Sequence, residues 1–136
     1  MVKITGEYQG ELHCVATHDP SGNTLVTDAP KDNQGRGEAF SPTDLVATAL
    51  ATCIATTMAI VARKQGVELN GLRYEVTKEM SSDAPRRIVR LTTTVWLPIS
   101  KTEALEKLLE HAAHHCPVHQ SLHPQVEKPI VLHWSV

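Results

Sequence analysis

Residues 41–66 read SPTDLVATALATCIATTMAIVARKQG and contain the strongest structural signal in the chain. The stretch opens with residues that favour a helix start: Ser41 suits the N-cap, Pro42 the first helical position, and Asp44 the position from which a carboxylate returns the capping bond. Basic residues followed by Gly66 are typical of a helix C-terminus. We therefore predict a long helix that begins after Ser41 and ends before Gly66.

The body of this predicted helix has no polar side. From Leu45 to Ile60 every face carries small or apolar residues, and the many alanines permit close packing of the backbone. A helix that is apolar all round is expected to be buried on all sides. The threonines and Cys53 within the run, and the charges at Asp44 and Arg63 that flank it, favour a buried core helix over a membrane span.

The rest of the chain predicts strands and one more helix. A second amphipathic helix is expected to begin at the capping motif 100–103 and to end at Cys116, because Pro117 disfavours helical geometry in the residue before it. The order strands, helix, strands, helix, strand predicts an α+β fold with antiparallel sheet, in a single domain of residues 1–136. The expected strands are residues 2–4, 12–16, 24–27, 72–80, 89–97 and 129–136.

The composition argues against several classes of protein. With 136 residues and 41% hydrophobic residues, the chain can bury one core but not two. Its formal net charge of -2 at pH 7 argues against nucleic acid or an anionic membrane as a partner, since both usually require a basic patch. Residues 1–7 lack the apolar region of a signal peptide, and we therefore expect a cytoplasmic protein.

Cys53 and Cys116 are the residues best suited to chemistry. Cys53 lies in the middle of the first predicted helix, and Cys116 ends the apolar stripe of the second. If both helices pack into one core, the two thiols can approach each other. Cysteines of cytoplasmic proteins more often react or bind metal than form structural disulfides. The residues alone leave two interpretations equally open: a redox couple, or two inert core thiols.

Two further residues have simpler explanations. Cys14 alternates with Leu12 and Ala16 on a predicted strand and has no neighbour that would stabilise a thiolate, so we interpret it as structural. Arg36 lies between two glycines shortly before the helix that carries Cys53. A redox thiolate needs a nearby cation, although an exposed loop arginine is the simpler interpretation of this residue.

Histidines gather around Cys116. His111 and His115 are one helical turn apart, and Cys116 and His119 have Cys-x-x-His spacing, which together could bind zinc. We favour a solvated helix face and expect no metal, because no second cysteine pair or glutamate lies at ligand spacing nearby. A histidine beside Cys116 could instead lower the pKa of its thiol and favour exchange. The cluster comprises His111, His114, His115, His119 and His123.

Three segments resemble the OsmC/Ohr family of small thiol-dependent peroxidases. Residues 41–45 and 49–53 are similar to the family's helix start and first cysteine, and residues 115–122, HCPVHQSL, are similar to its second-cysteine motif. Residues 67–69 then lead into an alternating strand pair, as in the family, and the order of elements matches over nearly the whole chain. The resemblance implies an OsmC-like fold, with antiparallel sheets packed around two long helices in an intertwined homodimer, and active sites at the subunit interface.

The resemblance also implies roles for the cysteines in oxidative-stress defence, without a cofactor. Cys53 would be the peroxidatic thiolate that attacks a hydroperoxide, and Cys116 would resolve the sulfenic acid to a disulfide that an external thiol reductant reopens. Better-characterised members carry a glutamate at the position of Thr43, which helps to orient an arginine over the thiol, whereas this chain has Asp44 one place later. This departure resembles the YhfA-like branch and leaves Arg36 as the candidate cation, acting across the dimer.

A small-molecule binding protein is the alternative function. A dimer interface lined by leucine, alanine and methionine could hold an apolar ligand without any peroxide turnover. Co-purification of a ligand would favour this alternative, and consumption of peroxide would favour the enzyme.

Overall fold

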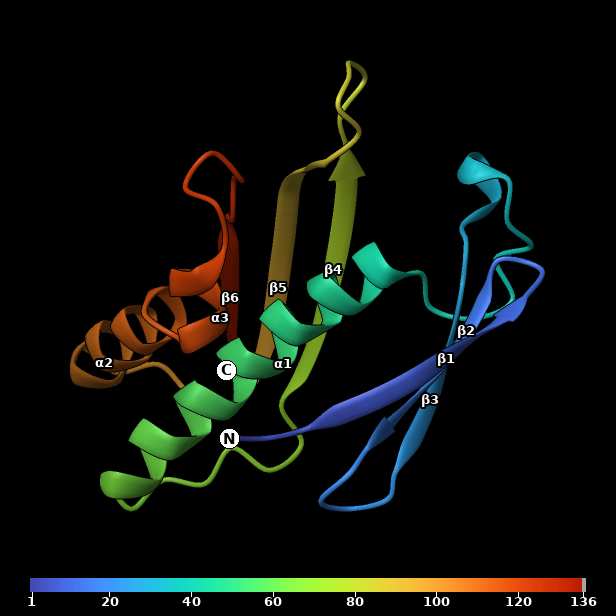
Figure 1. The fold of residues 1–136 in the computed structure, drawn as a ribbon. Coiled ribbons are helices and arrows are strands. Elements are labelled where there is room, and N and C mark those ends of the chain that lie inside the picture. The colour runs from blue at the N-terminus through green and yellow to red at the C-terminus, as the bar shows by residue number, and fades with distance from the viewer. Residues whose placement is uncertain (136) are drawn as a thin grey trace. The chain divides into compact units, whose positions relative to one another are not determined.

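The computed structural model describes residues 1–135, so Val136, expected at the end of the last strand, lies outside the described residues. The chain forms two compact units, Met1–Val46 and Ala47–Val136 (Figure 1). The boundary between the units falls within the first turns of helix α1 (Pro42–Lys64).

The N-terminal unit is a three-stranded antiparallel sheet of order β1-β2-β3. Its only buried residues, Asp28 and Ser41, are polar, and all of the buried apolar residues among residues 1–135 lie at or after Ala47. Large apolar side chains such as Ile4 and Tyr8 are exposed instead. The unit consists of β1 (Ile4–Gly10), β2 (His13–His18), β3 (Thr24–Asp28) and a short 3-10 turn (Lys31–Asn33).

Helix α1 confirms the predicted capping. The Ser41 backbone N–H donates to Asp44 Oδ2 at 3.0 Å, and the Asp44 backbone N–H donates to Ser41 Oγ at 3.1 Å, which completes a capping box. At the other end Gly66 adopts a left-handed conformation (φ 72) and its N–H donates to the Arg63 carbonyl. The sequence therefore predicted both ends of the helix correctly.

The expectation that α1 is buried on all sides is wrong for the single chain. On the opposite side from its buried stripe, Ala49 and Thr56 are exposed and Ile60 is 53% exposed. The physical reason is that one chain supplies only one layer of sheet and helix for α1 to pack against. The buried stripe consists of Ala47, Leu50, Ala51, Ile54, Met58 and Ala62.

The length and composition of α1 would allow it to cross a membrane. Its buried stripe is instead part of the core of the C-terminal unit, together with Leu91 and Val95 of β5 and Leu109 of α2. Such a stripe is typical of a core helix, because a spanning helix would present its apolar residues to lipid. The expected core helix is thus what the structure contains.

The C-terminal unit contains a three-stranded sheet of order β4-β5-β6. Strands β4 and β5 are antiparallel, as predicted, but β6 is parallel to β5, which corrects the expectation of a wholly antiparallel sheet. The two helices between β5 and β6 form a crossover that returns the chain in the same direction. The elements are β4 (Arg73–Met80), β5 (Ile88–Ser100), α2 (Glu103–His114), α3 (Pro117–Ser121) and β6 (Ile130–Ser135).

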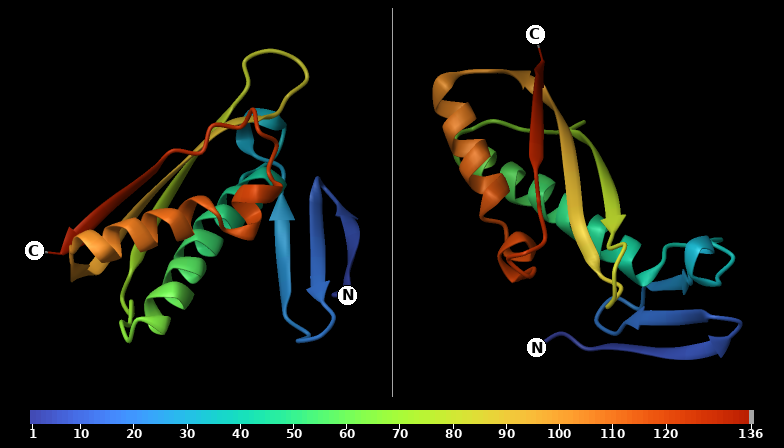
Figure 2. Two further views of the ribbon diagram at one scale, coloured as in Figure 1. Left: turned by 90° about the vertical axis from the view of Figure 1, so that its left-hand side faces the viewer. Right: turned by 90° about the horizontal axis from the view of Figure 1, so that it is seen from above.

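Helices α1 and α2 cover one face of this sheet (Figure 2). The side chains of β5 alternate, so that its buried residues all point toward the helices. Thr93 is the polar member of this set, and within residues 1–135 its Oγ1 is buried without a hydrogen-bond partner. The buried residues of β5 are Leu91, Thr93, Val95 and Leu97, and those of α2 are Leu109, Ala112 and Ala113.

Both ends of α2 lie inside the predicted bounds, since the helix was expected to end at Cys116 and its last residue is His114. Thr102, and not Ser100, is the N-cap, and its Oγ1 accepts from the Leu105 N–H at 3.2 Å, because the ladder of β5 still includes Ser100. Cys116 is extended (φ -67, ψ 150), as expected of a residue before proline. A short helix, α3, that the sequence analysis did not predict begins at Pro117.

Candidate functional site

Cys53 lies at the border between the buried and the open side of α1. It is half-buried, with the fully buried Leu50 one turn before it and the exposed Ala49 and Thr56 as its other neighbours along the helix. Its Sγ lies 4.0 Å from Thr57 Oγ1, one turn further on. The sequence analysis did not identify Thr57, although the four-residue spacing from Cys53 places it on the same face.

Cys116 is fully buried at the break between α2 and α3. Because Pro117 excludes a helical conformation at Cys116, α2 cannot continue, and proline suits the first position of the next helix. The thiol then takes the place of an N-cap side chain, with its Sγ accepting from the His119 N–H at 3.4 Å. The proline therefore determines both the position and the hydrogen bond of this sulfur.

The structure brings the two thiols together. Burial raises the pKa of the Cys116 thiol above its ordinary value. A hydrogen bond with the Cys53 side chain and the negative charge of that side chain raise the pKa of Cys116 further, whereas the N–H groups of His119 and Val118 lower it without reversing the shift. These effects act at short range, so the two thiols are neighbours within the C-terminal unit.

The effect of the histidines on Cys116 differs from the expectation. We predicted that a histidine beside the thiol could lower its pKa, but the pKa is raised, and His119 acts through its backbone amide. Burial lowers the pKa of the His119 imidazole, and the charges of Lys128, His114 and His115 lower it further. The lowered pKa makes the His119 imidazole a poorer carrier of positive charge than an ordinary histidine.

The histidine cluster does not assemble a metal centre. The rings of His111 and His115 are stacked with their centroids 4.0 Å apart, and those of His114 and His119 meet edge to face at 5.9 Å. Within the described part of the chain, no group of three or more histidine, cysteine, aspartate or glutamate side chains could hold a metal ion. The zinc interpretation therefore lacks a ligand set in residues 1–135.

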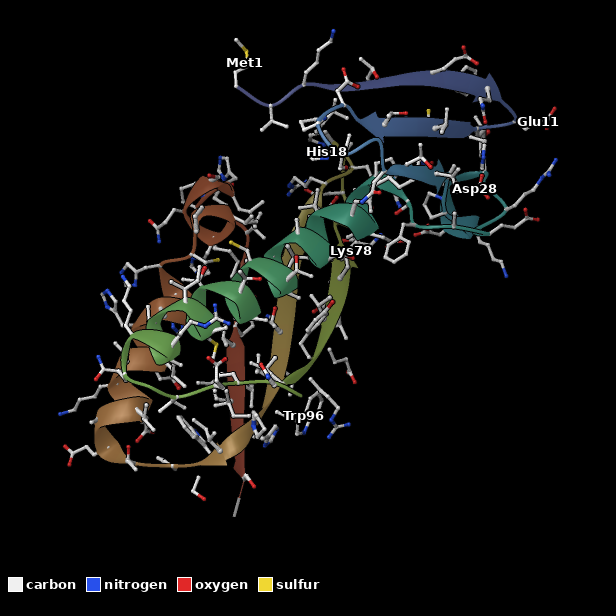
Figure 3. The ribbon with its side chains drawn as sticks, turned by 90° about the horizontal axis from the view of Figure 1, so that it is seen from below. Met1, Glu11, His18, Asp28, Lys78 and Trp96 are labelled. Carbon is white, nitrogen blue, oxygen red and sulfur yellow. The ribbon has the colours of Figure 1, made fainter. Side chains whose placement is uncertain are left out.

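Arg36 belongs to the N-terminal unit, where its Nη2 lies 3.5 Å from Glu11 Oε2. Both side chains are exposed and border a cavity of about 310 Å³ that His13 and Asp28 also line. Figure 3 labels Glu11, at the turn between β1 and β2, and Asp28, at the end of β3. Asp28 is buried there and its Oδ2 accepts from the Glu38 N–H at 3.1 Å. The predicted role of Arg36 beside Cys53 stays a prediction.

Cys14 and Asp44 occupy structural positions. Cys14 is a free, half-buried thiol on β2, opposite Tyr8 of β1 and Thr27 of β3. The carboxylate of Asp44 accepts from the Ser41 N–H at the start of α1, as expected of a capping residue. Cys14 and Asp44 are therefore interpreted as structural residues, in contrast to Cys53 and Cys116.

The raised pKa of Cys116 leads to a test in the Cys14→Ser background. Adding Cys53→Ala removes the charge and the hydrogen bond of Cys53, so the pKa of Cys116 should fall and its thiolate should form at lower pH. Ultraviolet absorbance of the thiolate, followed as the pH is raised, measures this midpoint. If the midpoint for Cys116 stays unchanged or moves to higher pH, Cys53 is not the neighbour that raises it.

Comparisons with known proteins agree with this arrangement of elements. The family model described as OsmC-like protein matches residues 35–128, which is more than half of the chain. A crystal structure from Psychrobacter arcticus 273-4, named for osmotic stress induction and detoxification response, is 42% identical, with 97% of this chain and 94% of that chain covered and a TM-score of 0.89. No curated protein sequence matches the chain.

More distant structures share the fold. An organic hydroperoxide resistance protein OsmC from Legionella pneumophila is 18% identical, with 100% of this chain and 97% of that chain covered and a TM-score of 0.74. The organic hydroperoxide resistance protein OhrB of Bacillus subtilis is 20% identical, with 98% of each chain covered and a TM-score of 0.74. Because the family model and the 42% identical structure both extend across most of the sequence, this chain belongs to the OsmC-like family and has its α+β fold.

Proposed function

We propose that the protein reduces organic or inorganic hydroperoxides at the expense of thiols, in oxidative-stress defence. The observation that supports this most directly is the interaction between Cys53 and Cys116, which are far apart in the sequence and meet in the core of one unit. When two thiols are neighbours, a sulfenic acid formed on one can condense with the other to a disulfide without a large rearrangement. If both cysteines were inert core residues, nothing would require them to be neighbours.

The different surroundings of the two sulfurs support different roles. Cys53 is half-buried beside the open face of α1, where a peroxide can reach it, whereas Cys116 is 0% exposed. The raised pKa of Cys116 also favours the protonated form of that thiol. We therefore propose Cys53 as the peroxidatic residue and Cys116 as the resolving residue.

The proposed reaction consumes one peroxide and two thiols. The Cys53 thiolate attacks the distal oxygen of the hydroperoxide, the O–O bond breaks, and the departing alkoxide takes a proton and leaves as an alcohol, or as water when the substrate is hydrogen peroxide. The Cys116 S–H, which faces Cys53, is one source of that proton. The Cys116 thiolate then attacks the Cys53 sulfenic acid, so that the S–S bond forms, the S–O bond breaks, and the departing hydroxide takes a proton from solvent to become water. An external thiol reductant returns two electrons to the disulfide.

We further propose that Arg36 supplies positive charge to the Cys53 thiolate across the dimer. Within the described residues the partners of Cys53 are Thr57 and Cys116, and neither is a cation. The carboxylate lies at Asp44, one place after Thr43, which supports placement in the YhfA-like branch. Arg36 is exposed beside Glu11 and free to exchange one carboxylate partner for a thiolate.

An intertwined homodimer is the proposed assembly. The open face of α1 and the N-terminal sheet leave Ile4, Tyr8, Phe40 and Ile60 each more than half exposed, between 53% and 66%. Soluble monomers rarely expose that much apolar surface, and a second copy of the chain would cover it. We also propose that residues 1–136 act as one OsmC-like domain in the cytoplasm, where the free thiols of this chain would stay reduced.

A small-molecule binding protein remains the second candidate, because of one apolar hollow. A cavity of about 270 Å³ lies on the exposed side of α1, and its lining is predominantly aliphatic and aromatic. A pocket of this kind is suited to a small apolar ligand. Its lining residues include Ala55, Ala59, Leu69, Leu72 and Tyr74.

Peroxide turnover separates the two candidates. The wild-type protein should consume tert-butyl hydroperoxide or hydrogen peroxide in the presence of dithiothreitol, measured as loss of peroxide. Cys53→Ser should reduce the rate to the uncatalysed level, and Cys14→Ser should leave it unchanged. Arg36→Met should slow the reaction roughly tenfold, the order expected for the loss of one charge-assisted hydrogen bond.

Full turnover by Cys53→Ser would exclude the enzyme as proposed. A bound apolar molecule detected by native mass spectrometry, in a wild-type protein that consumes no peroxide, would favour the binding protein.

Oxidation should link Cys53 to Cys116. After one equivalent of peroxide and alkylation of the remaining thiols, mass spectrometry of an unreduced digest should find this pair as one cross-linked species, with Cys14 alkylated. In Cys116→Ser the sulfenic acid has no resolving thiol, so Cys53 should be trapped by dimedone. A cross-link that contains Cys14 instead would contradict the assignment of roles.

The assembly can be tested by light scattering during size exclusion. We expect a species of twice the chain mass of 14.9 kDa. Ile60→Glu places a charge on the open face of α1 and should shift the protein toward the monomer, whereas Ile60→Leu should keep the dimer. Wild-type protein that is monomeric at micromolar concentration would argue against the dimer.

A further inference from the structure

The hydroxyl of Thr57 is a polar side-chain partner of Cys53 on the same helix. Its Oγ1 lies 4.0 Å from Cys53 Sγ, and both side chains are half-buried. Residues four apart on a helix are stacked along one face, so the continuous helix α1 maintains this arrangement without any loop movement. The contact is therefore a built-in feature of the helix that carries the thiol.

A second threonine on α1 shows what the usual alternative is. Thr52 Oγ1 donates to the Thr48 carbonyl at 2.8 Å, which is the common back-bond of a threonine within a helix. Among the described residues, the recorded partner of Thr57 Oγ1 is the sulfur of Cys53 instead. The two threonines thus share a helix and a residue type but differ in what their hydroxyls face.

The direction of this hydrogen bond depends on the state of the sulfur. With a neutral thiol, either atom can donate. A thiolate has no proton, so the Thr57 hydroxyl is then the only possible donor of the two. Hydrogen bonds to a charged acceptor are stronger than those between neutral groups, so the contact favours the thiolate over the thiol.

We propose that Thr57 is a further residue of the reaction site, whose hydroxyl donates to the Cys53 thiolate and holds its sulfur in place. This inference rests on the proposed role of Cys53 and adds a donor on α1 to the S–H of Cys116. The Thr57 hydroxyl belongs to α1 and the Cys116 S–H to the start of α3, so the two donors approach the sulfur from different elements and together restrict its orientation. The thiolate thereby keeps a hydrogen bond from its own helix after Cys116 has given up its proton.

The test is the rate at which iodoacetamide alkylates Cys53, followed by peptide-resolved mass spectrometry as a function of pH. Thr57→Val keeps the shape of the side chain and removes the donor, and it should slow alkylation at pH 7 about fivefold. At alkaline pH, where Cys53 is ionised in both proteins, the two rates should converge. Thr57→Ser restores the donor and should stay within about twofold of the wild-type rate.

Thr52→Val is the matched control, since it removes a hydroxyl on the same helix that bonds a carbonyl. It should alkylate at the wild-type rate. Unchanged alkylation of Thr57→Val, an equal loss in Thr52→Val, or a difference that persists at alkaline pH would each overturn the proposal. Circular dichroism verifies that each variant is folded, and Thr57→Ala provides a second donor-free variant.

Alkylation requires no peroxide, so this experiment is independent of turnover. A Thr57 effect in a protein without peroxidase activity would refute the proposed function and leave the Thr57 contact supported. Peroxide turnover by the wild-type protein without a Thr57 effect on alkylation would support the proposed function and refute the proposed role of Thr57.

Discussion

The burial of one stripe of α1 against β5 and α2 is the interaction on which the other features depend. Fully buried side chains on all three elements, such as Leu50, Val95 and Leu109, form this core. Because Cys53 lies at the edge of the stripe and Cys116 follows the end of α2, the same packing that stabilises the unit brings the sulfurs together. The opposite face of α1 is apolar but open, and this is the surface for which a second copy of the chain is proposed.

The break at Pro117 controls the chemistry of the second thiol. A helix that continued through Cys116 would place its side chain on a helix face, whereas the extended conformation makes it the cap of α3. Two effects then oppose each other at the sulfur: the N–H groups of α3 favour its charged form, and burial together with Cys53 favours the protonated form. Burial is the largest of these effects, so the protonated form of the Cys116 thiol is favoured.

Local sequence signals predicted well the elements that depend on neighbouring residues. The capping box at Ser41 and Asp44, the glycine stop at Gly66 and the extended conformation of Cys116 before Pro117 were all correct, because each is a backbone hydrogen-bonding or steric effect within a few residues. The parallel pairing of β6 was missed, since strand direction depends on which edge of the sheet is open after the crossover. The cap of α2 was misplaced by two residues, because the extent of β5 is determined by its partner strands.

The sequence by itself determined the family and the α+β order of elements, and it selected Cys53 and Cys116 as the candidate reactive cysteines. It could not show that Cys53 and Cys116 interact, because contacts between distant segments depend on packing across the whole unit and have no local signature. The tertiary structure decided the sign of the pKa shift of Cys116, since burial is a property of the folded core and outweighs the nearby helix cap. The contact of Thr57 with Cys53, by contrast, follows from four-residue spacing within one helix, so it is already contained in the sequence once α1 is predicted.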